Sequence, residues 1–329
     1  MKLSIVVPIY NVADYLPKCV DSLLNQGLAS TDYEIILVDD GSTDRSGQIA
    51  DDYANRYAHI RVIHQTNQGL SMARNAGVAV AQGAYVQFVD SDDYLEPNVL
   101  GVLIKKMDQE HLDVLRFNYQ NVDECYRVFE PYKDPKIFVD YTDSVSDGLT
   151  FLTERLGYGC YAWQFMMRTT LAKRSIFTAG IYFEDTEWTP RLLASAERVT
   201  SVDTVVYNYL MRQGSITQSV SEAKKRKVLT DKISLVHALQ QQMADKADQR
   251  WYEGMIAHTV LSILGCIVAD FYAERATYLH LLRQSHVYPL SYYHATRRVK
   301  RKLRLINLSP ALFCWGMYVK GNINLSLSK

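Results

Sequence analysis

The sequence lacks the cysteine patterns that mark zinc sites and disulfide frameworks. Its 329 residues contain five cysteines, which are far apart and form no Cys-x-x-Cys pair, so a reducing cytoplasm is the expected setting. The glycine-rich motifs GxGxxG and GxxxxGK[ST] are also missing, which argues against a Rossmann dinucleotide site and against a P-loop. The cysteines are Cys19, Cys125, Cys160, Cys266 and Cys314.

Long hydrophobic runs are scarce as well. Residues 254–269 contain no Asp, Glu, Lys or Arg, but they include His258, Thr259 and Ser262 and fall short of the ~20 apolar residues of a membrane span. We therefore expect a buried helix there. The apolar run at residues 3–8 is too short for a signal peptide and predicts the first strand of the fold.

The net charge is zero, but the charge is unevenly distributed. Residues 221–329 contain 17 Lys and Arg against 7 Asp and Glu, whereas residues 1–220 contain 19 against 29. This shift coincides with a change of pattern, because residues 221–329 have mostly helical periodicity. We expect a domain at 1–220, with halves at about 1–110 and 111–220, followed by a helical, basic region at 221–329.

Strand and helix patterns alternate through the first hundred residues. Such alternation predicts a doubly wound, mostly parallel α/β sheet, which binds ligands at the carboxyl ends of its strands. After about residue 112 the spacing favours antiparallel additions to this sheet. The predicted strands are 4–9, 34–38, 61–64, 85–89, 113–119, 126–129, 161–167 and 199–211, and the predicted helices are 13–25, 44–57, 70–81, 97–109, 147–156 and 189–196.

The run from Tyr85 to Asp93 ends in three carboxylates within four residues, at Asp90, Asp92 and Asp93. Like charges this close repel one another, so we expect a cation between them. In an extended segment Asp90 and Asp92 point the same way, whereas Asp93 points elsewhere and is available to cap the next helix. Carboxylates together with phosphate oxygens are the usual ligands of protein-bound Mg²⁺.

Four segments in order carry a family resemblance, and they cover about residues 3–100. The sequence resembles the family 2 glycosyltransferases of the GT-A fold; the resemblance is weaker between about residues 100 and 217, and it fades after about residue 220. The resemblance implies a bacterial, inverting, Mg²⁺- or Mn²⁺-dependent hexosyltransferase that uses a nucleotide diphosphate sugar. The segments are VVPIYN from Val6, VDDGSTD from Val38, GLSMARNAG from Gly69 and FVDSDD from Phe88.

The resemblance implies donor-side roles for particular residues. Asp92 and Asp90 would hold the metal, and Asp90 would also approach the ribose. Asp39 would accept a hydrogen bond from the nucleotide base, which favours a UDP-sugar, while neighbouring Asp40 has an equal alternative as a turn residue. At the first strand end, Pro8 and Tyr10 would bracket the base, with ordinary packing as the alternative for Tyr10.

A guanidinium is expected near the donor diphosphate. Arg74 would contact the diphosphate or ribose, or pair with one of the clustered aspartates, and the two roles are compatible. Arg212, within the segment that resembles the family's closing stretch, would contact phosphate, although a solvated arginine is the plainer alternative.

The resemblance also implies acceptor-side roles. Asp185 would be the catalytic base that takes the proton of the acceptor hydroxyl, with a helix N-cap as the alternative. Glu184 beside it would contact substrate. Trp163 would stack on a sugar or pack in the core, but Gln164 stands where the family has asparagine and the family's nearby lysine is missing.

The tail contains a basic run next to an apolar, aromatic-bearing segment, together spanning residues 297–320. This combination favours peripheral contact with an anionic membrane, with packing on the catalytic domain and nucleic-acid binding as alternatives; lipid fits the apolar segment better than nucleic acid does. We therefore expect a cytoplasmic glycosyltransferase that acts on a lipid-linked or growing surface glycan. The competing hypotheses are a catalytically silent nucleotide-sugar-binding subunit and an aspartate-based phosphatase.

Overall fold

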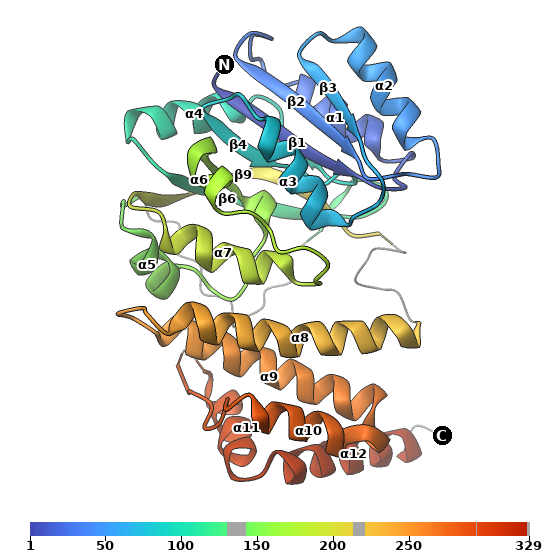
Figure 1. Cartoon of the computed structure of the whole chain (residues 1–329), viewed down its shortest axis with the longest axis vertical. Helices are drawn as coiled ribbons and strands as arrows, with labels where there is room; N and C mark the ends of the chain where they lie inside the picture. Colours follow the sequence, from blue (N-terminus) through green and yellow to red (C-terminus); the bar gives the residue numbers. More distant parts are fainter. Residues whose placement is uncertain (130–142, 213–220, 294, 328–329) are drawn as a thin grey trace. The chain divides into compact units, whose positions relative to one another are not determined.

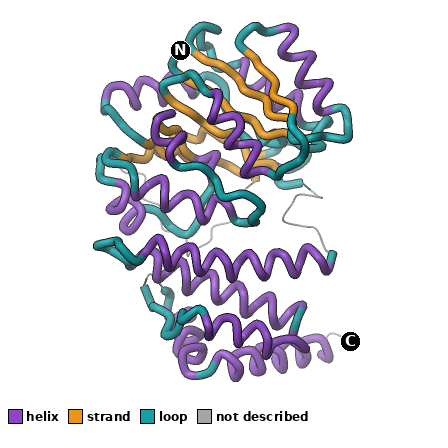
Figure 2. The backbone as a smooth tube through the Cα atoms, in the orientation of Figure 1, coloured by secondary structure: helices purple, strands orange, loops and turns teal. Residues whose placement is uncertain are grey.

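A computed structural model describes residues 1–129, 143–212, 221–293 and 295–327. The chain divides into two compact units, Met1–Thr217 and Gln218–Lys329. Strands occur in the first unit, whereas the described part of the second is built from helices (Figures 1 and 2). The predicted GT-A class, a mostly parallel sheet with antiparallel additions and a helical C-terminal region, is confirmed.

The sheet of the first unit has the strand order β3-β2-β1-β4-β8-β6-β9-β5, and β7 pairs with β6. Strands β1 to β4 are parallel, β8 runs antiparallel to both β4 and β6, and β9 is parallel to β6. The strands are β1 (Leu3–Ile9), β2 (Tyr33–Asp39), β3 (Ile60–His64), β4 (Tyr85–Phe88), β5 (Tyr94–Leu95), β6 (Val114–Val122), β7 (Val128–Phe129), β8 (Phe165–Arg168) and β9 (Val199–Leu210).

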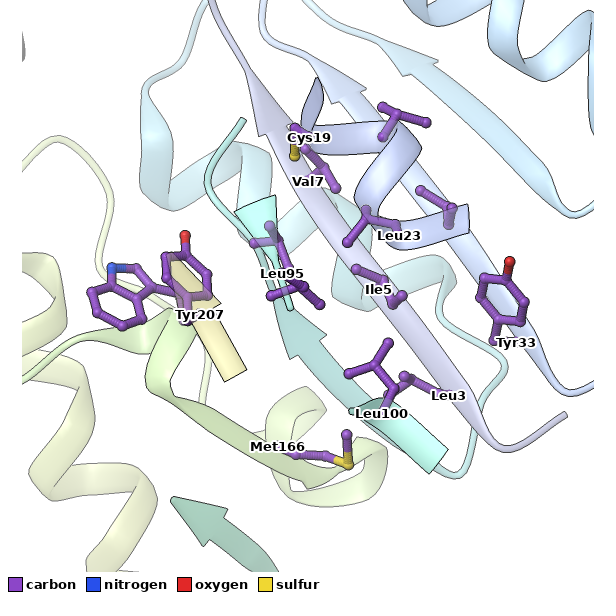
Figure 3. Packing of buried hydrophobic residues seen from close by; sticks show 14 of the residues in the cluster. Leu3, Ile5, Val7, Cys19, Leu23, Tyr33, Leu95, Leu100, Met166 and Tyr207 are labelled. Carbon is purple, nitrogen blue, oxygen red and sulfur yellow. The ribbon is translucent and has the colours of Figure 1, made fainter. Parts of the chain in front are cut away.

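Helices cover both faces of the parallel strands. Side chains of a strand alternate between faces, so Ile5 and Val7 join the core with Leu23 of α1 and Leu100 of α4, whereas Val6 faces α3 (Figure 3). The helices of this unit are α1 (Leu16–Leu24), α2 (Ser46–Arg56), α3 (Leu70–Val80), α4 (Leu100–Gln109), α5 (Gly148–Thr150), α6 (Thr169–Arg174) and α7 (Glu184–Ala194).

Three predicted helix starts differ from the structure by three residues or more, and the first is α1, which begins at Leu16 and not at residue 13. Helix α4 begins at Leu100 and not at Pro97, because Asn98 has a left-handed φ of 59° and the side chain of Gln26 accepts the first amide hydrogens of the helix. Helix α7 begins at Glu184, five residues before the predicted start, and contains Pro190 in its interior. The segment before β8 is a short 3-10 turn, Ala162–Gln164, where strand was expected.

The second unit consists of α8 (Glu222–Met243), α9 (Arg250–Asp270), a 3-10 turn (Tyr272–Glu274), α10 (Arg275–Gln284), α11 (Arg297–Leu308) and α12 (Pro310–Leu327). Among the described residues, α9 is the one helix long and apolar enough to cross a membrane, but 56% of its apolar window is buried in the protein. It contacts α8 and α12 of the same unit. The expected buried helix at residues 254–269 is therefore present.

Candidate active site

The acidic segment after β4 has two exposed carboxylates and one buried carboxylate. Asp90 and Asp92 are each about a quarter exposed, with side-chain values of 24% and 25%. Asp93 is buried and accepts hydrogen bonds from Tyr207 Oη and from the Leu210 amide, both at 2.7 Å. Asp93 therefore fastens the loop to β9, and it does not cap α4.

Arg74 connects the two halves of the first unit. Its side chain is 1% exposed, and its guanidinium donates to Asp90 Oδ1 at 3.0 Å, Glu184 Oε1 at 3.0 Å and Asp185 Oδ1 at 2.8 Å. Burial disfavours its charge, but the three carboxylates outweigh burial and raise the pKa of Arg74 above its ordinary value. Arg74 therefore forms the ion pair with a clustered aspartate that was one of its two expected roles. The same guanidinium contacts both Asp90 and Asp185.

Asp185 lies in the first turn of α7, where the backbone is set by Phe183 in the left-handed region with φ of 65°. Phe183 is the N-cap residue, so Asp185 is not the cap. Its second oxygen accepts the Ala162 amide at 3.0 Å. Burial raises the pKa of Asp185 to about 7, against the opposing effect of Arg74. A carboxylate that titrates near neutrality is suited to general base catalysis.

Burial disfavours the charged form of the carboxylates at Asp92 and Asp93. Burial, with the negative charge of Asp90, raises the pKa of Asp92, and burial raises that of Asp93 well above its usual range. Arg212 binds Asp92 Oδ2 through Nε and Nη2 at 2.9 Å and lies over the ring of Tyr15 at 4.7 Å. Arg212 thus pairs with the carboxylate that the resemblance assigns to the metal, and it is not a solvated side chain.

The metal prediction can be compared with the side chains present. Within the described residues no group of three or more His, Cys, Asp and Glu side chains is arranged to hold a metal ion. Asp90 and Asp92 supply partly exposed oxygen ligands, which suit Mg²⁺ or Mn²⁺ when phosphate oxygens complete the coordination.

Asp39 and Asp40 end β2 and have different environments. Asp40 is 3% exposed and accepts the amides of Gln68 and Gly69 at 2.9 and 2.8 Å, so it ties the end of β2 to the loop before α3 and is not the local turn residue that was the alternative. Asp39 accepts the Ser42 amide at 3.0 Å through one oxygen and contacts His64 Nδ1 at 2.9 Å through the other. Asp39 is thus held in one orientation at the strand end.

His64 is a residue whose contact with Asp39 the sequence did not indicate. Its two ring nitrogens contact Asp39 Oδ2 at 2.9 Å and Asp51 Oδ1 at 3.0 Å. Two carboxylate partners require two N–H donors, and these hydrogen bonds raise the pKa of His64. A histidine at the carboxyl end of β3 was the available signal, but its second partner, Asp51, lies in α2.

The end of β1 presents an exposed ring. Tyr10 is 50% exposed, whereas Pro8 is buried within the sheet. The carboxamide of Asn11 accepts the amides of Thr43 and Asp44 at 2.8 and 3.3 Å and so joins this strand end to the loop after β2. Tyr10 is therefore available for stacking, and Pro8 shapes the backbone beneath it.

Trp163 does not present a ring to solvent. It is 3% exposed and stacks on Tyr207 at 4.2 Å between ring centroids and on Tyr161 at 5.0 Å. The buried indole packs in a cluster of aromatic rings, so the sugar-stacking role expected from the sequence gives way to core packing.

The family follows from comparison with known proteins. The description "Glycosyl transferase family 2" matches residues 4–173. The chain belongs to this family. The match covers the donor-side strand ends, Arg74 and Trp163, and it ends before Asp185.

Curated relatives in glycosyl transferase family 2 include EpsJ of Bacillus subtilis, an uncharacterized glycosyltransferase that is 38% identical over 66% of this chain and 63% of its own. YibD of Escherichia coli, also an uncharacterized glycosyltransferase, is 34% identical over 68% of this chain and 65% of its own. The match thus spans less than two thirds of either relative.

The fold is shared with a solved protein. The crystal structure of residues 1–349 of Staphylococcus aureus TarS superposes with a TM-score of 0.71 at 21% identity, covering 98% of this chain and 92% of that one. A crystal structure of the same TarS fragment in complex with UDP-GlcNAc superposes with a TM-score of 0.70. At this identity the similarity shows a common GT-A architecture, including the helical region beyond the sheet.

Proposed function

We propose that the protein is an inverting, metal-dependent glycosyltransferase that moves a hexosyl group from a UDP-sugar to a hydroxyl of a lipid-linked or growing surface glycan. The observation that carries the proposal is the buried guanidinium of Arg74, which joins Asp90 at the end of β4 to Asp185, 95 residues further along the chain. Membership of the glycosyltransferase family and the fold shared with a UDP-GlcNAc-binding protein support the donor class.

The proposed reaction is a single displacement at the anomeric carbon. Asp185 accepts the proton of the acceptor hydroxyl while the hydroxyl oxygen forms its bond to that carbon. The bond from the carbon to the donor phosphate oxygen breaks, and UDP leaves with the electron pair. Arg74 holds the Asp185 carboxylate in place, and the pKa of about 7 makes Asp185 a competent base near neutral pH.

Mg²⁺ or Mn²⁺ would be held by Asp92 and Asp90. Such a cation neutralises charge on a departing diphosphate. Arg212 already places positive charge on Asp92, so it must release this carboxylate when the site is loaded. A guanidinium freed at that point is positioned to contact a phosphate of the donor.

The donor base would lie at the ends of β1 and β2. Asp39, oriented by His64, would accept the N3–H of uracil, and the exposed ring of Tyr10 would stack on the base above Pro8. Glu184 shares Arg74 with Asp185 and lies next to it, which is consistent with contact to the transferred sugar or to the acceptor.

A panel of nucleotide sugars tests the proposal. The protein is incubated with each donor and Mn²⁺, with and without EDTA, and release of nucleotide diphosphate and of free or transferred sugar is measured. We expect turnover of a UDP-sugar that EDTA abolishes. Donor binding by calorimetry without turnover would favour a silent binding subunit, and release of inorganic phosphate from a phosphoester without sugar transfer would favour a phosphatase.

A further inference from the structure

Two basic runs of the second unit differ in their partners. In α8 the cations are paired: Lys225 with Asp270, Arg226 with Glu222 and Glu274 at 2.8 and 2.7 Å, and Lys227 with Asp231 at 2.7 Å. In α11 six cations are exposed, and none forms an ion pair with an acidic side chain of the described residues. These six are Arg297, Arg298, Lys300, Arg301, Lys302 and Arg304.

The two faces of α11 have opposite character. Leu303 and Ile306 are 1% and 0% exposed, and the helix packs against α12. Residues at spacings of four, seven and eleven fall on one stripe of a helix, and here that stripe is Arg297, Arg301, Arg304 and Leu308. The outward face is therefore a row of cations that ends in an apolar side chain.

The apolar ridge continues from α11 into α12. Leu308, the last residue of α11, is 83% exposed, and Leu312 and Trp315, about one turn apart in the first two turns of α12, are 50% and 56% exposed. Exposed leucine and tryptophan beside lysine and arginine are typical of surfaces that enter the boundary between lipid headgroups and acyl chains. Water gives these side chains no favourable contact, so the ridge needs an apolar partner.

A cavity beside Leu308 adds basic side chains to the exposed face of α11 and α12. The cavity of about 330 Å³ is lined by Arg283, His286, Tyr288, Asn307, Leu308 and Pro310, with no acidic residue among them. The Tyr288 hydroxyl is buried without a hydrogen-bond partner in the described structure. A phosphate group would satisfy this hydroxyl and the two basic side chains together.

We infer that α11 and the first two turns of α12 form a docking surface for an anionic phospholipid bilayer. The six unpaired cations contact headgroup phosphates, while Leu308, Leu312 and Trp315 insert among the upper acyl chains. Nucleic acid would satisfy the cations but would leave the ridge in water. The inference deepens the proposed function, since it puts the enzyme where a lipid-linked acceptor lies, but vesicle binding is measurable whether or not the protein transfers sugar.

The first test is flotation of the full chain with vesicles of phosphatidylcholine alone or with 30% phosphatidylglycerol. We expect binding to the anionic vesicles that high salt weakens. The triple variant Arg297→Gln, Arg301→Gln, Arg304→Gln should lose about 100-fold in partition coefficient, because each cation near such a surface contributes a factor of about five. The matched control, Arg45→Gln, Lys105→Gln, Arg174→Gln, removes three exposed cations of the first unit and should bind like the wild type.

Trp315 supplies a second readout. The other three tryptophans are buried, at 3%, 0% and 0% exposure, so a fluorescence change on adding anionic vesicles reports Trp315. We expect a blue shift that Trp315→Phe abolishes while flotation persists. Equal flotation of the triple variant and its control, an unchanged Trp315 spectrum, or stronger competition by duplex DNA than by anionic vesicles would each overturn the inference.

Discussion

Replacing Arg74 by glutamine should move the acidic limb of the pH–activity profile. In the wild type, kcat/KM should fall tenfold per pH unit below about 7, because the base Asp185 becomes protonated. Arg74 donates to Asp185 at 2.8 Å and opposes the upward shift of its pKa, so removing this charge raises the pKa further.

The size of the shift follows from the geometry. Two unit charges about 4 Å apart attract by about 4 kcal/mol at an effective dielectric of about 20, which equals about three pKa units. Solvent entering the site would reduce this, so we expect the limb of Arg74→Gln to rise by about one to three pH units. Activity at pH 7 should drop about fivefold for a rise of one unit and about 500-fold for a rise of three, and it should recover partly at pH 8.5.

The assay is UDP release from the donor that the nucleotide-sugar panel identifies, measured between pH 5 and 9. Arg212→Gln is the matched control, because it removes a guanidinium from Asp92 and does not contact Asp185. Arg74→Lys keeps the charge without the planar fork, so its limb should stay near that of the wild type. An Arg74→Gln protein that folds and binds the donor but keeps the acidic limb of the wild type would show that Asp185 is not the group that titrates.

Further variants test the packing and the donor site. A Cβ at Gly77 would lie 2.3 Å from Val6 Cγ1, so Gly77→Ala should lower the free energy of unfolding by about 1–3 kcal/mol. At Gly101 in α4 the nearest atom would be 3.6 Å away, so Gly101→Ala should be neutral or stabilising by about 0.5–1 kcal/mol. Urea melts measure both. His64→Ala frees the Asp39 carboxylate and should raise the calorimetric Kd for UDP about tenfold, the equivalent of one oriented hydrogen bond; an unchanged Kd would remove His64 from the donor site.

Local patterns predicted the sheet well because the short apolar runs of its fully buried strands, and the helical spacing between them, are properties of neighbouring positions. The convergence of the acidic strand ends follows from parallel pairing alone. The start of α4 could not be predicted, since it depends on a left-handed Asn98 and on Gln26, which is far away in sequence.

The inner structure of the site depends on long-range contacts that periodicity does not encode. Arg74 lies 111 residues from Asp185, and only the folded chain shows that one guanidinium contacts both this residue and Asp90. The same holds for Trp163, whose burial depends on packing against Tyr207 of β9. Residue types in the sequence identified the candidate site residues, and only the tertiary contacts of the structure show which of them are exposed and which are buried.

The most direct test of the central claim is the Asp185→Asn variant, assayed for sugar transfer and for UDP binding in parallel. Asparagine keeps the size of the side chain but cannot accept the acceptor's proton at neutral pH. We predict that transfer falls by at least about 100-fold while the calorimetric Kd for UDP stays within about threefold of the wild type. Transfer at the wild-type rate in Asp185→Asn would contradict the account.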